Sequence, residues 1–306
     1  MKSNRLEVNI AGLKLANPTM LASGILGYST ETLESIVSGG AGAVVTKSVG
    51  LKPRMGYANP TVVQAEFGLI NAMGLPNPGI DNFVKEIREA RNALKVSLIV
   101  SVYGYSADEY ASVSHKAVVA GADAVELNVS CPHVKETGSE IGQNSRILRE
   151  IVRKVRTVIG KTVIVKLSPN VTSIVELAEA AAQGGADALT IMNTVKAMAI
   201  DVETAMPVLS NKAGGLSGQA VKPIALRCVY DVFERVKLPI IGCGGVASWR
   251  DAAEFFLAGA SAVQIGTAVA TKGPTVFRAV AIGLDNYVRR QGFKGVNDIV
   301  GLSHRK

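Results

Sequence analysis

Short apolar runs alternate with longer amphipathic segments along almost the whole chain. The runs are rich in aliphatic and β-branched residues, and each is followed by a segment with apolar residues at helical spacing. Eight runs fit this description, at 18–23, 43–48, 97–102, 124–130, 162–168, 188–193, 239–245 and 262–268. Helices are expected after them, near 30–38, 79–93, 107–120, 144–159, 172–183, 220–236, 248–258 and 273–289. Because strands that are apolar throughout and separated by helices form a parallel sheet covered on both faces, the pattern predicts an α/β fold.

Four of the joints between a helix and the next strand repeat one signature. They read SGGAGAVV, VAGADAVEL, QGGADALTI and LAGASAVQI, and in each a glycine ends the helix, where its left-handed conformation costs no Cβ clash. Eight βα units with this recurrence favour a (β/α)8 TIM barrel over a doubly wound sheet, for which six strands suffice. We expect a single barrel domain over residues 1–306, with an N-terminal β extension in the alternating segment MKSNRLEVNIAG.

Two loops are longer than a plain barrel needs, one after the second predicted strand and one after the sixth. Residues 49–78 include NAMGLPNPG, which is rich in Gly and Pro and carries no charge, and residues 194–219 end in NKAGGLSGQ. Loops of this length in a compact domain are usually functional or disordered. The first is expected to be a structured loop over the active site, with a plain surface insertion as the alternative.

Composition narrows the class of protein. The formal net charge of +8 fits either a solvated basic surface or attraction to an anionic ligand. Lys and Arg are nowhere clustered with aromatic residues, so nucleic-acid binding is disfavoured. No apolar run approaches the length of a membrane span, and the N-terminus lacks the apolar core of a signal peptide. We therefore expect a cytoplasmic protein without a membrane partner.

The three cysteines are Cys131, Cys228 and Cys243, and their spacing matches no zinc site. They are too few for an iron–sulfur cluster in this chain alone, and their scatter favours a reducing compartment. No metal site is expected. Cys228 in a predicted helix and Cys243 in a predicted strand are expected to be core residues, whereas Cys131 follows the fourth predicted strand in LNVSCPHVK.

Polar residues gather where the predicted strands end, which is the end of a TIM barrel that carries the active site. They are Ser23, Lys47, Ser48, Asn128, Ser130, Cys131, Ser168, Asn193 and Thr194. Lys166 lies inside an apolar strand, so it either pairs with a barrel carboxylate such as Glu126 or contacts a ligand. The pairs Gly244-Gly245 and Gly266-Thr267 at the last two strands predict a phosphate site, because glycine lets backbone N–H groups approach an anion.

These motifs resemble those of the dihydroorotate dehydrogenases over essentially the whole chain. The resemblance rests on NPTMLASG, TKSVGLKPRMG, NAMGLPNPG, LNVSCP, VKLSPN, NTVK, GGLSGQAVKPIALR, GCGGV and AGASAVQIGTA. Within the family the chain is most similar to class 1, the soluble and cysteine-dependent class, and there to the catalytic subunit of the NAD-linked type (1B). The resemblance implies FMN-dependent oxidation of (S)-dihydroorotate to orotate in de novo pyrimidine biosynthesis.

The resemblance also implies roles for individual residues. The FMN contacts would be Ser23, Lys47, Ser48, Ser101, Asn128, Lys166, Met192, Gly218, Gly244, Gly245, Gly266 and Thr267. The substrate contacts would be Lys47, Asn71, Ala72, Met73, Gly74, Leu75, Asn128, Asn193 and Thr194. Cys131 aligns with the catalytic base, which would take the C5 proton on one face of the substrate while the C6 hydride goes to N5 of FMN on the other. Positive neighbours would raise the thiolate fraction of Cys131.

Three positions depart from the family pattern. Ser101 stands where the family commonly has an asparagine, and its shorter hydroxyl would contact the flavin less directly. Met192 stands where isoleucine is frequent, a swap of similar volume that should preserve the contact. His133 replaces an amide in the more common SCPN, so this substrate contact would titrate, unless His133 is merely a loop residue.

Other flavin barrels and other electron acceptors stay open as alternatives. A dihydropyrimidine dehydrogenase-like barrel would act on uracil or thymine, which carry no carboxylate. A tRNA dihydrouridine synthase would fit the basic charge, but only about forty residues follow the last predicted strand, too few for an RNA-binding domain. A barrel that binds flavin or phosphate without chemistry is the non-enzymatic alternative.

The resemblance also implies an assembly. NAD⁺ would be reached through a partner subunit that carries FAD and a 2Fe–2S cluster, in a heterotetramer built on a homodimer of this chain. A homodimer that uses fumarate or a dye-like acceptor is the alternative, and a quinone is disfavoured because the quinone class uses Ser as the base.

Overall fold

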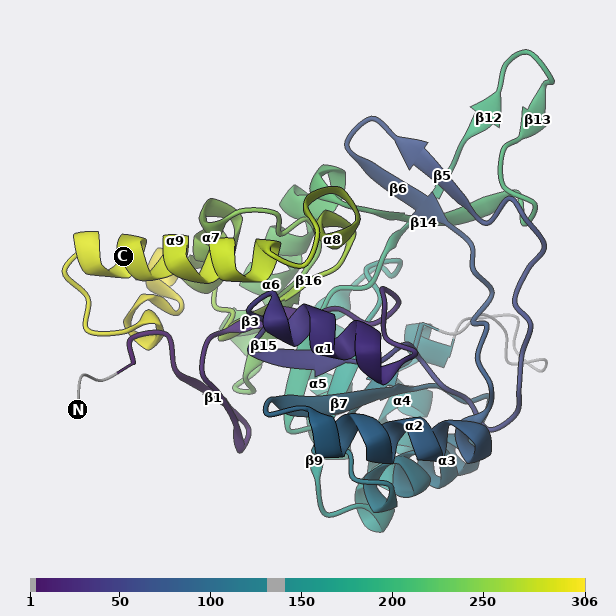
Figure 1. Cartoon of the computed structure of the whole chain (residues 1–306), viewed down its shortest axis with the longest axis horizontal. Coiled ribbons are helices and arrows are strands. Elements are labelled where there is room, and N and C mark those ends of the chain that lie inside the picture. The colour runs from purple at the N-terminus through teal and green to yellow at the C-terminus, as the bar shows by residue number, and fades with distance from the viewer. Residues whose placement is uncertain (1–3, 131–140, 306) are drawn as a thin grey trace.

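The computed structural model describes residues 4–130 and 141–305, and its centre is a closed barrel of eight parallel strands (Figure 1). Around the barrel the strands follow the order β10, β15, β16, β3, β4, β7, β8 and β9. Their bounds are β3 (Thr19–Leu21), β4 (Ala43–Val45), β7 (Ser97–Val102), β8 (Ala124–Asn128), β9 (Thr162–Leu167), β10 (Ala188–Ile191), β15 (Ile240–Cys243) and β16 (Ala262–Ile265). Each strand matches one of the eight predicted runs, so the predicted (β/α)8 barrel is confirmed.

The helices that surround the barrel agree with their predicted ranges to within a few residues. They are α1 (Thr30–Ser38), α2 (Ile80–Ala93), α3 (Ala107–Val119), α4 (Ser145–Val158), α5 (Ile174–Gly184), α6 (Lys222–Arg235), α7 (Trp249–Leu257) and α9 (Val276–Arg290). The short helix α8 (Thr267–Lys272) was not predicted. Short 3₁₀ turns are η1 (Ile141–Gln143), η2 (Gln219–Val221), η3 (Val296–Ile299) and η4 (Leu302–His304). The last predicted strand, 262–268, was wrong at its end, because α8 begins at Thr267.

Side chains at the helix starts explain why the helices begin where they do. Ser29, Ser106, Asn144, Ser173 and Ser248 each accept a hydrogen bond from a backbone N–H in the first turn of the helix that follows. Such caps satisfy donors that have no partner inside the helix, and each typically stabilises it by about 1 kcal/mol. The βα loops therefore end at fixed positions around the barrel.

At the amino-terminal end of the barrel, two of the glycine-containing segments that join a helix to the next strand also carry an Arg–Asp ion pair, here called a clamp. Arg91 of α2 pairs with Asp123, just before β8, and the same carboxylate accepts a backbone N–H of β7 at 2.9 Å. Arg156 of α4 pairs with Asp187, just before β10, at 2.6 Å, and that carboxylate accepts a backbone N–H of β9 at 2.8 Å. Each clamp therefore ties a helix end to two neighbouring strands.

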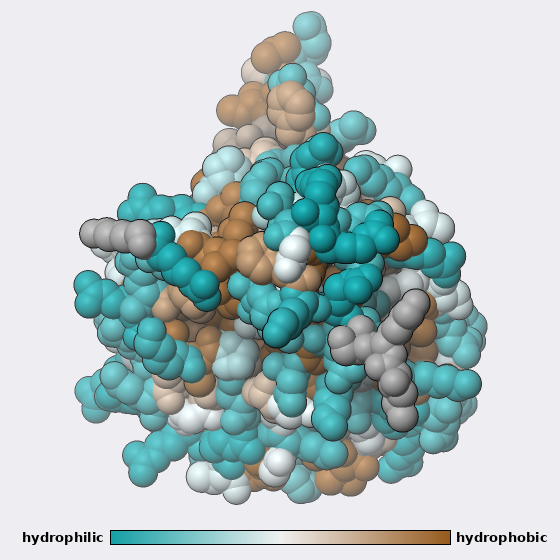
Figure 2. Space-filling model, turned by 90° about the vertical axis from the view of Figure 1, so that its left-hand side faces the viewer, coloured by the Kyte–Doolittle hydropathy of each residue, from teal (hydrophilic) through white to brown (hydrophobic). Residues whose placement is uncertain are grey.

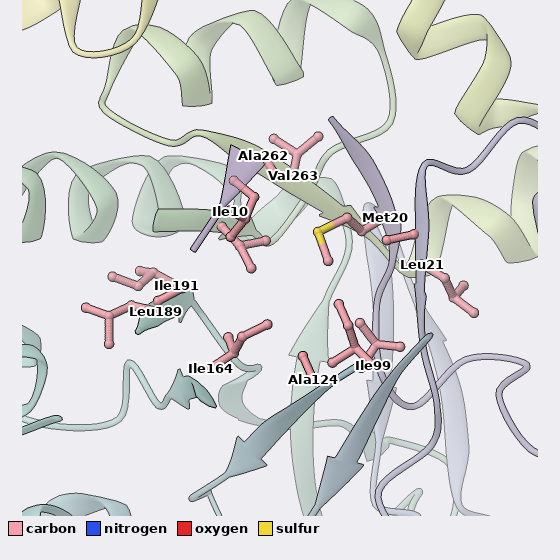
Figure 3. Packing of buried hydrophobic residues seen from close by; sticks show 14 of the residues in the cluster. Ile10, Met20, Leu21, Ile99, Ala124, Ile164, Leu189, Ile191, Ala262 and Val263 are labelled. Carbon is pink, nitrogen blue, oxygen red and sulfur yellow. The ribbon is translucent and has the colours of Figure 1, made fainter. Parts of the chain in front are cut away.

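Aliphatic side chains fill the core of the molecule. Figure 3 shows Met20 and Leu21 of β3, Ile99 of β7 and Ile164 of β9 within one cluster, and all four are completely buried. Burial of each such side chain contributes on the order of 1.5–3 kcal/mol. Because the barrel is packed in this way, a ligand site is expected at one of its ends and not along its axis.

The predicted N-terminal β extension is confirmed as a hairpin of β1 (Val8–Ile10) and β2 (Leu13–Leu15). Its alternate residues are buried, and Ile10 reaches the core shown in Figure 3. The hydroxyl of Thr162 donates to the carbonyl of Ala11 at 3.0 Å, which ties the hairpin to the start of β9. Across the described residues, no helix has both the length and the apolar character needed to cross a membrane.

The two long loops meet in a second sheet that the sequence did not predict. β5 (Val62–Ala65) and β6 (Gly68–Asn71) come from the first loop, and β11 (Val195–Met198) and β14 (Ala213–Ser217) from the second. They pair antiparallel in the order β11, β14, β6, β5. A small hairpin of β12 (Ile200–Asp201) and β13 (Met206–Pro207) projects furthest from the barrel in Figure 1.

Candidate active site

Five polar side chains at the carboxyl ends of β4, β7, β8 and β10 form one hydrogen-bonded rim chain, made of Ser48, Ser101, Asn128, Ser130 and Asn193. The hydroxyls of Ser48 and Ser101 are 2.8 Å apart, and Nδ2 of Asn128 donates to Ser48 Oγ at 3.0 Å. Nδ2 of Asn193 donates to Asn128 Oδ1 at 3.2 Å and to Ser130 Oγ at 3.0 Å. Residues from four strands that are far apart in sequence are therefore held in register at one end of the barrel.

Ser101, a member of this rim chain, is held by hydrogen bonds to both its side chain and its backbone. Its side chain is completely buried, and its backbone N–H is held by Thr46 Oγ1 at 3.1 Å. Its hydroxyl is engaged by Ser48 at 2.8 Å. The flavin contact that the resemblance implies for Ser101 would therefore act through Ser48, because the short hydroxyl is already committed to that partner.

Lys47 brings a positive charge to the rim. Its Nζ lies 4.5 Å from the centroid of the Tyr28 ring, whose face attracts a cation. Burial lowers the pKa of Lys47, and no charged partner among the described residues offsets that effect. A partly buried ammonium without a carboxylate is a natural site for an anionic ligand group.

Lys166 lies deeper, in a cluster of buried polar side chains inside the barrel. Its Nζ donates to Gln264 Oε1 at 2.9 Å and to Ser23 Oγ at 3.2 Å, and lies 3.6 Å from Glu126 Oε1. Glu126 Oε2 accepts hydrogen bonds from Gln264 Nε2 at 2.5 Å and from Thr190 Oγ1 at 2.9 Å. The pairing of Lys166 with Glu126, one of the two alternatives from the sequence, is therefore present, and the flavin contact stays a prediction.

Gln264 and Thr190 were missed by the sequence reasoning, although both interrupt apolar strands. Gln264 lies in AVQI of β16 and Thr190 in ALTI of β10, and each is no more than 1% exposed. A polar residue in a strand that is buried on both faces is the signal that would have found them, because such a residue needs a buried partner.

A glycine-lined segment lies where β15, β14 and α8 meet. Gly218 and Gly245 have φ angles of +98° and +85°, which L side chains rarely adopt. A Cβ at Gly218 would come within 2.7 Å of the backbone at the start of β6, and one at Gly245 within 2.7 Å of Lys222 Cβ. Thr267 Oγ1 donates to Ser217 Oγ at 2.8 Å beside them. The phosphate site predicted from Gly244, Gly245, Gly266 and Thr267 stays a prediction, and this crowded backbone suits it.

The segment 71–79 is structured and tied to the second sheet. Asn71 Nδ2 donates to the carbonyl of Gly215 in β14 at 3.3 Å. The buried Asn77 donates to the carbonyl of Leu75 at 3.0 Å and to the hydroxyl of Tyr103 at 2.8 Å. Because β11 of the same sheet begins directly after Thr194, the sheet joins the segment to the rim. The segment is therefore structured, and its place over the active site stays a prediction.

The middle of this segment is held through its backbone. The carbonyl of Met73 accepts the N–H of Tyr57 at 3.1 Å, and the carbonyl of Gly74 accepts Nε of Arg54 at 2.6 Å. The side chains predicted to contact substrate here, those of Ala72, Met73 and Leu75, are thus carried on a fixed backbone.

Of three further predicted positions, the structure describes Met192 but not Cys131 or His133. Met192 is almost completely buried after β10, and its N–H donates to the carbonyl of Cys243 at 2.8 Å, beside the Gly244-Gly245 turn. Cys131, the predicted base, and His133 lie outside the described residues, so the structure does not locate either side chain.

A separate hollow among the described residues lies at the opposite end of the barrel. It measures about 560 Å³ and is lined by Lys14, Lys95, Lys161 and the Arg91–Asp123 clamp, among others. Arg91 already pairs with Asp123 and donates to two backbone carbonyls, and the three lysines are exposed. This hollow offers charge but no reactive group, so the carboxyl-terminal rim is the better candidate for chemistry.

Comparisons with known proteins show the family of the chain. Residues 5–288 match the family model described as dihydroorotate dehydrogenase. The chain is 51% identical over 298 residues to the protein of Pyrococcus abyssi named dihydroorotate dehydrogenase B (NAD(+)), catalytic subunit, with 97% of this chain and 99% of the relative covered. Proteins of the same name from Methanocella arvoryzae and Methanothermobacter thermautotrophicus are each 48% identical over 301 residues, with 98% of both chains covered. The chain belongs to the dihydroorotate dehydrogenase family.

Proposed function

We propose that this chain is the catalytic subunit of an NAD⁺-linked dihydroorotate dehydrogenase, which oxidises (S)-dihydroorotate to orotate in pyrimidine biosynthesis. The observation that carries the proposal is the convergence of Lys47, Asn128 and Asn193 on one rim of the barrel, with amide groups beside a partly buried ammonium that has no acidic partner within residues 4–130 and 141–305. Relatives named for this activity, aligned along nearly the whole chain, support it.

FMN is the cofactor that these residues fit. The donors Lys166, Asn128 and Ser48 suit the carbonyl and ring-nitrogen acceptors of a flavin. Asn128 of β8 pairs with Lys166 of the neighbouring strand β9, and Asn128 donates to Ser48, which follows β4. Gly218 and Gly245 have positive φ angles that favour glycine, and backbone of this kind can direct N–H groups toward the phosphate. The flavin, when bound, supplies the acceptor for the hydride that leaves C6 of the substrate.

The rim would hold the substrate by its charge and by its polar ring atoms. Lys47 would pair with the carboxylate, and Asn128, Asn193 and the Asn71–Leu75 segment would hydrogen-bond the pyrimidine ring. The rim chain fixes both asparagine amides before any ligand arrives, so binding orders few side chains. Fixed orientation of this kind can lower a reaction barrier by several kcal/mol.

Cys131 would act as the general base. Its role rests on the resemblance of LNVSCP, where it follows β8 by three positions. The thiolate of Cys131 would take the C5 proton as the electron pair of the C5–H bond forms the C5–C6 double bond. The other two thiols are poor candidates, since burial raises the pKa of Cys228 to about 11 and also raises that of Cys243.

The relatives are named as catalytic subunits, which implies that they assemble with another subunit. We propose a matching assembly for this chain: a homodimer within a heterotetramer whose other subunit carries FAD and a 2Fe–2S cluster. Exposed apolar residues support a protein interface. Met198, Ile200, Val202 and Met206 of the projecting hairpin are 50–84% exposed. In Figure 2 hydrophobic residues appear on the projection at the top of an otherwise mostly hydrophilic face. The mass of the Val202→Glu protein in solution, compared with the unsubstituted chain, tests this interface.

An anaerobic titration tests the reaction itself. The purified, FMN-loaded chain should lose its yellow flavin absorbance on addition of dihydroorotate and release orotate, whereas dihydrouracil should leave the colour unchanged. A chain that reacts with dihydrouracil and not with dihydroorotate would instead be a dihydropyrimidine dehydrogenase-like barrel. Lys47 favours the first outcome, because an unpaired ammonium suits a substrate with a carboxylate.

A further inference from the structure

Glu126 is an unexpected residue for the interior of a barrel. It lies in the middle of β8, in a run that is otherwise apolar up to Asn128, and none of its surface is exposed. A carboxylate removed from water is strongly unfavourable unless other groups compensate its charge. Its Oε2 accepts two hydrogen bonds, whereas Oε1 has no hydrogen-bond partner and faces Lys166 at 3.6 Å.

Gln264 links Glu126 to Lys166 across the barrel. The strands β8 and β16, which carry Glu126 and Gln264, stand opposite each other in the strand order. One end of the Gln264 amide donates to Glu126, and the other end accepts from Lys166 at 2.9 Å. Because the two ends of an amide are fixed relative to each other, the carboxylate decides which end of Gln264 faces the ammonium. Glu126 thus places a negative charge near Lys166 and also fixes the orientation of the Gln264 amide.

Lys166 extends the link toward the rim. Its ammonium donates to the hydroxyl of Ser23, which follows β3 at the carboxyl end of the barrel. Lys166 is 3% exposed, so its position is set by these contacts and not by solvent. The arrangement is a continuous set of charge-assisted hydrogen bonds from the barrel interior to the place proposed for the flavin.

We propose that Glu126, acting through Gln264, is a positioning residue that holds the Lys166 ammonium charged and in place against the flavin, and so favours the reduced flavin. The inference rests on the proposed function, in which Lys166 contacts FMN. Two-electron reduction with uptake of one proton leaves the ring with one more negative charge, and a fixed positive charge beside it stabilises that state. Glu126 touches neither flavin nor substrate in this account.

The charged groups around Lys166 shift its pKa and so determine the pH at which it loses its proton. Among the described residues, the titratable groups that face it are Glu126 from β8 and Cys243 from β15. Burial lowers the pKa of Lys166, but negative charge on Cys243 and Glu126 raises it, and the net pKa lies above the ordinary value. Because burial raises the pKa of Cys243, that thiol is uncharged at neutral pH, and Glu126 is the effective counter-charge. Without Glu126, burial would dominate and Lys166 would lose its proton at lower pH.

The test is the midpoint potential of the bound flavin as a function of pH, measured on the FMN-loaded chain. Glu126→Gln removes the charge and keeps the shape, and Asp123→Asn is the matched control, because it removes one carboxylate at the other end of the same strand. The wild type and Asp123→Asn should give superimposable profiles. In Glu126→Gln the potential should fall more steeply as pH rises between about 6 and 9, because a neutral Lys166 no longer favours the reduced flavin.

The affinity for oxidised FMN supplies a second readout that is independent of turnover. At the upper end of this pH range, the dissociation constant of FMN in Glu126→Gln should rise roughly tenfold over the wild type, as expected for loss of a charge-assisted hydrogen bond. At the lower end, where Lys166 regains its proton, the two dissociation constants should converge. Equal constants throughout would count against the proposal.

Two further variants separate positioning from general damage to the barrel. Gln264→Met keeps the volume and removes the link, so it should shift the profile in the same direction by a smaller amount, and it replaces Glu126→Gln if that protein does not fold. In a Lys166→Met background, Glu126→Gln should add no pH dependence, because the residue through which it acts is gone. Profiles of Glu126→Gln and Gln264→Met that both coincide with the wild type would overturn the inference. Failure of the wild type to hold or reduce flavin would instead contradict the proposed function.

Discussion

Two carboxylates on and beside strand β8, Asp123 just before it and Glu126 in its middle, have opposite tasks. At the amino end, Asp123 is tied to Arg91 and to a backbone N–H of β7, in an arrangement that Asp187 and Arg156 repeat beside β10. Toward the carboxyl end, Glu126 belongs to a cluster that occurs once in the described chain and leads to the rim. The amino end of the barrel repeats the same Arg–Asp pair, whereas the cluster that leads to the carboxyl end is built from residues of different types.

The difference lies in how completely charges are paired. In both clamps an arginine meets a carboxylate with further backbone hydrogen bonds, so little charge is left for a ligand. At the rim, Lys47 lies over the ring of Tyr28 and pairs with no carboxylate of the described residues, and the asparagine amides bond to each other and to serine hydroxyls. Since unpaired polar groups in a partly buried place are costly, their presence at one end marks that end as the ligand site.

The largest effect is expected from Cys131→Ala at the carboxyl end. The flavin should stay bound, while its bleaching by dihydroorotate should slow by on the order of 10² or more, because no base takes the C5 proton. Rapid anaerobic mixing measures this rate. Cys228→Ala removes a thiol from α6 and should react like the wild type. A fast Cys131→Ala reaction would remove the base from this residue.

Lys47→Met should weaken orotate binding by roughly 10- to 100-fold, the range expected when a charge-assisted hydrogen bond to a carboxylate is lost. Uracil, which lacks the carboxylate, should bind the variant and the wild type alike. The control is Lys95→Met, which removes the same charge at the amino end. Equal orotate affinities for Lys47→Met and wild type would show that the rim ammonium does not recognise the substrate.

The affinity for orotate should also depend on pH through Lys47. Burial lowers the pKa of this lysine, so its ammonium is lost as pH rises through that lowered value, and orotate binding should weaken in the alkaline range. Bound orotate should in turn raise the pKa of Lys47. Lys47→Arg should keep the affinity but lose this pH dependence, because arginine does not titrate there. Isothermal titration across pH distinguishes the two proteins.

The smallest effect is expected at the amino end. Asp123→Asn should lower the free energy of unfolding by about 1 kcal/mol, a modest value because the Arg91–Asp123 pair is roughly one-third exposed. Thermal unfolding measures the loss, and kcat/KM for dihydroorotate should not change. A large loss of activity with unchanged stability would contradict the division of labour between the two ends.

The barrel was predictable because its strands are buried on both faces and therefore appear as unbroken apolar runs. The glycine joints added a second, independent signal. The sheet of β5, β6, β11 and β14 was not predictable, since its strands are short and half-exposed, and β14 reads AGGLS, with neither alternation nor strong β propensity. Its pairing joins Asn71 to Gly215, which no local pattern connects.

The sequence indicated which polar residues lie at the strand ends, but not which of them contact one another. Polar residues at strand ends identified Lys47, Asn128 and Asn193. The bond between Gln264 and Glu126 could not be anticipated, because the two residues are 138 positions apart and meet only when the barrel closes. The engagement of Ser101 by Ser48 likewise depends on the register of β4 against β7.

A crystal structure of the chain with FMN and orotate tests the central claim most directly. The account predicts the orotate carboxylate against Lys47, the flavin ring against Lys166, and the sulfur of Cys131 facing C5 on the side of the pyrimidine away from the flavin. Either ligand bound in the hollow at the amino end, or a Cys131 sulfur directed away from the pyrimidine, would contradict it.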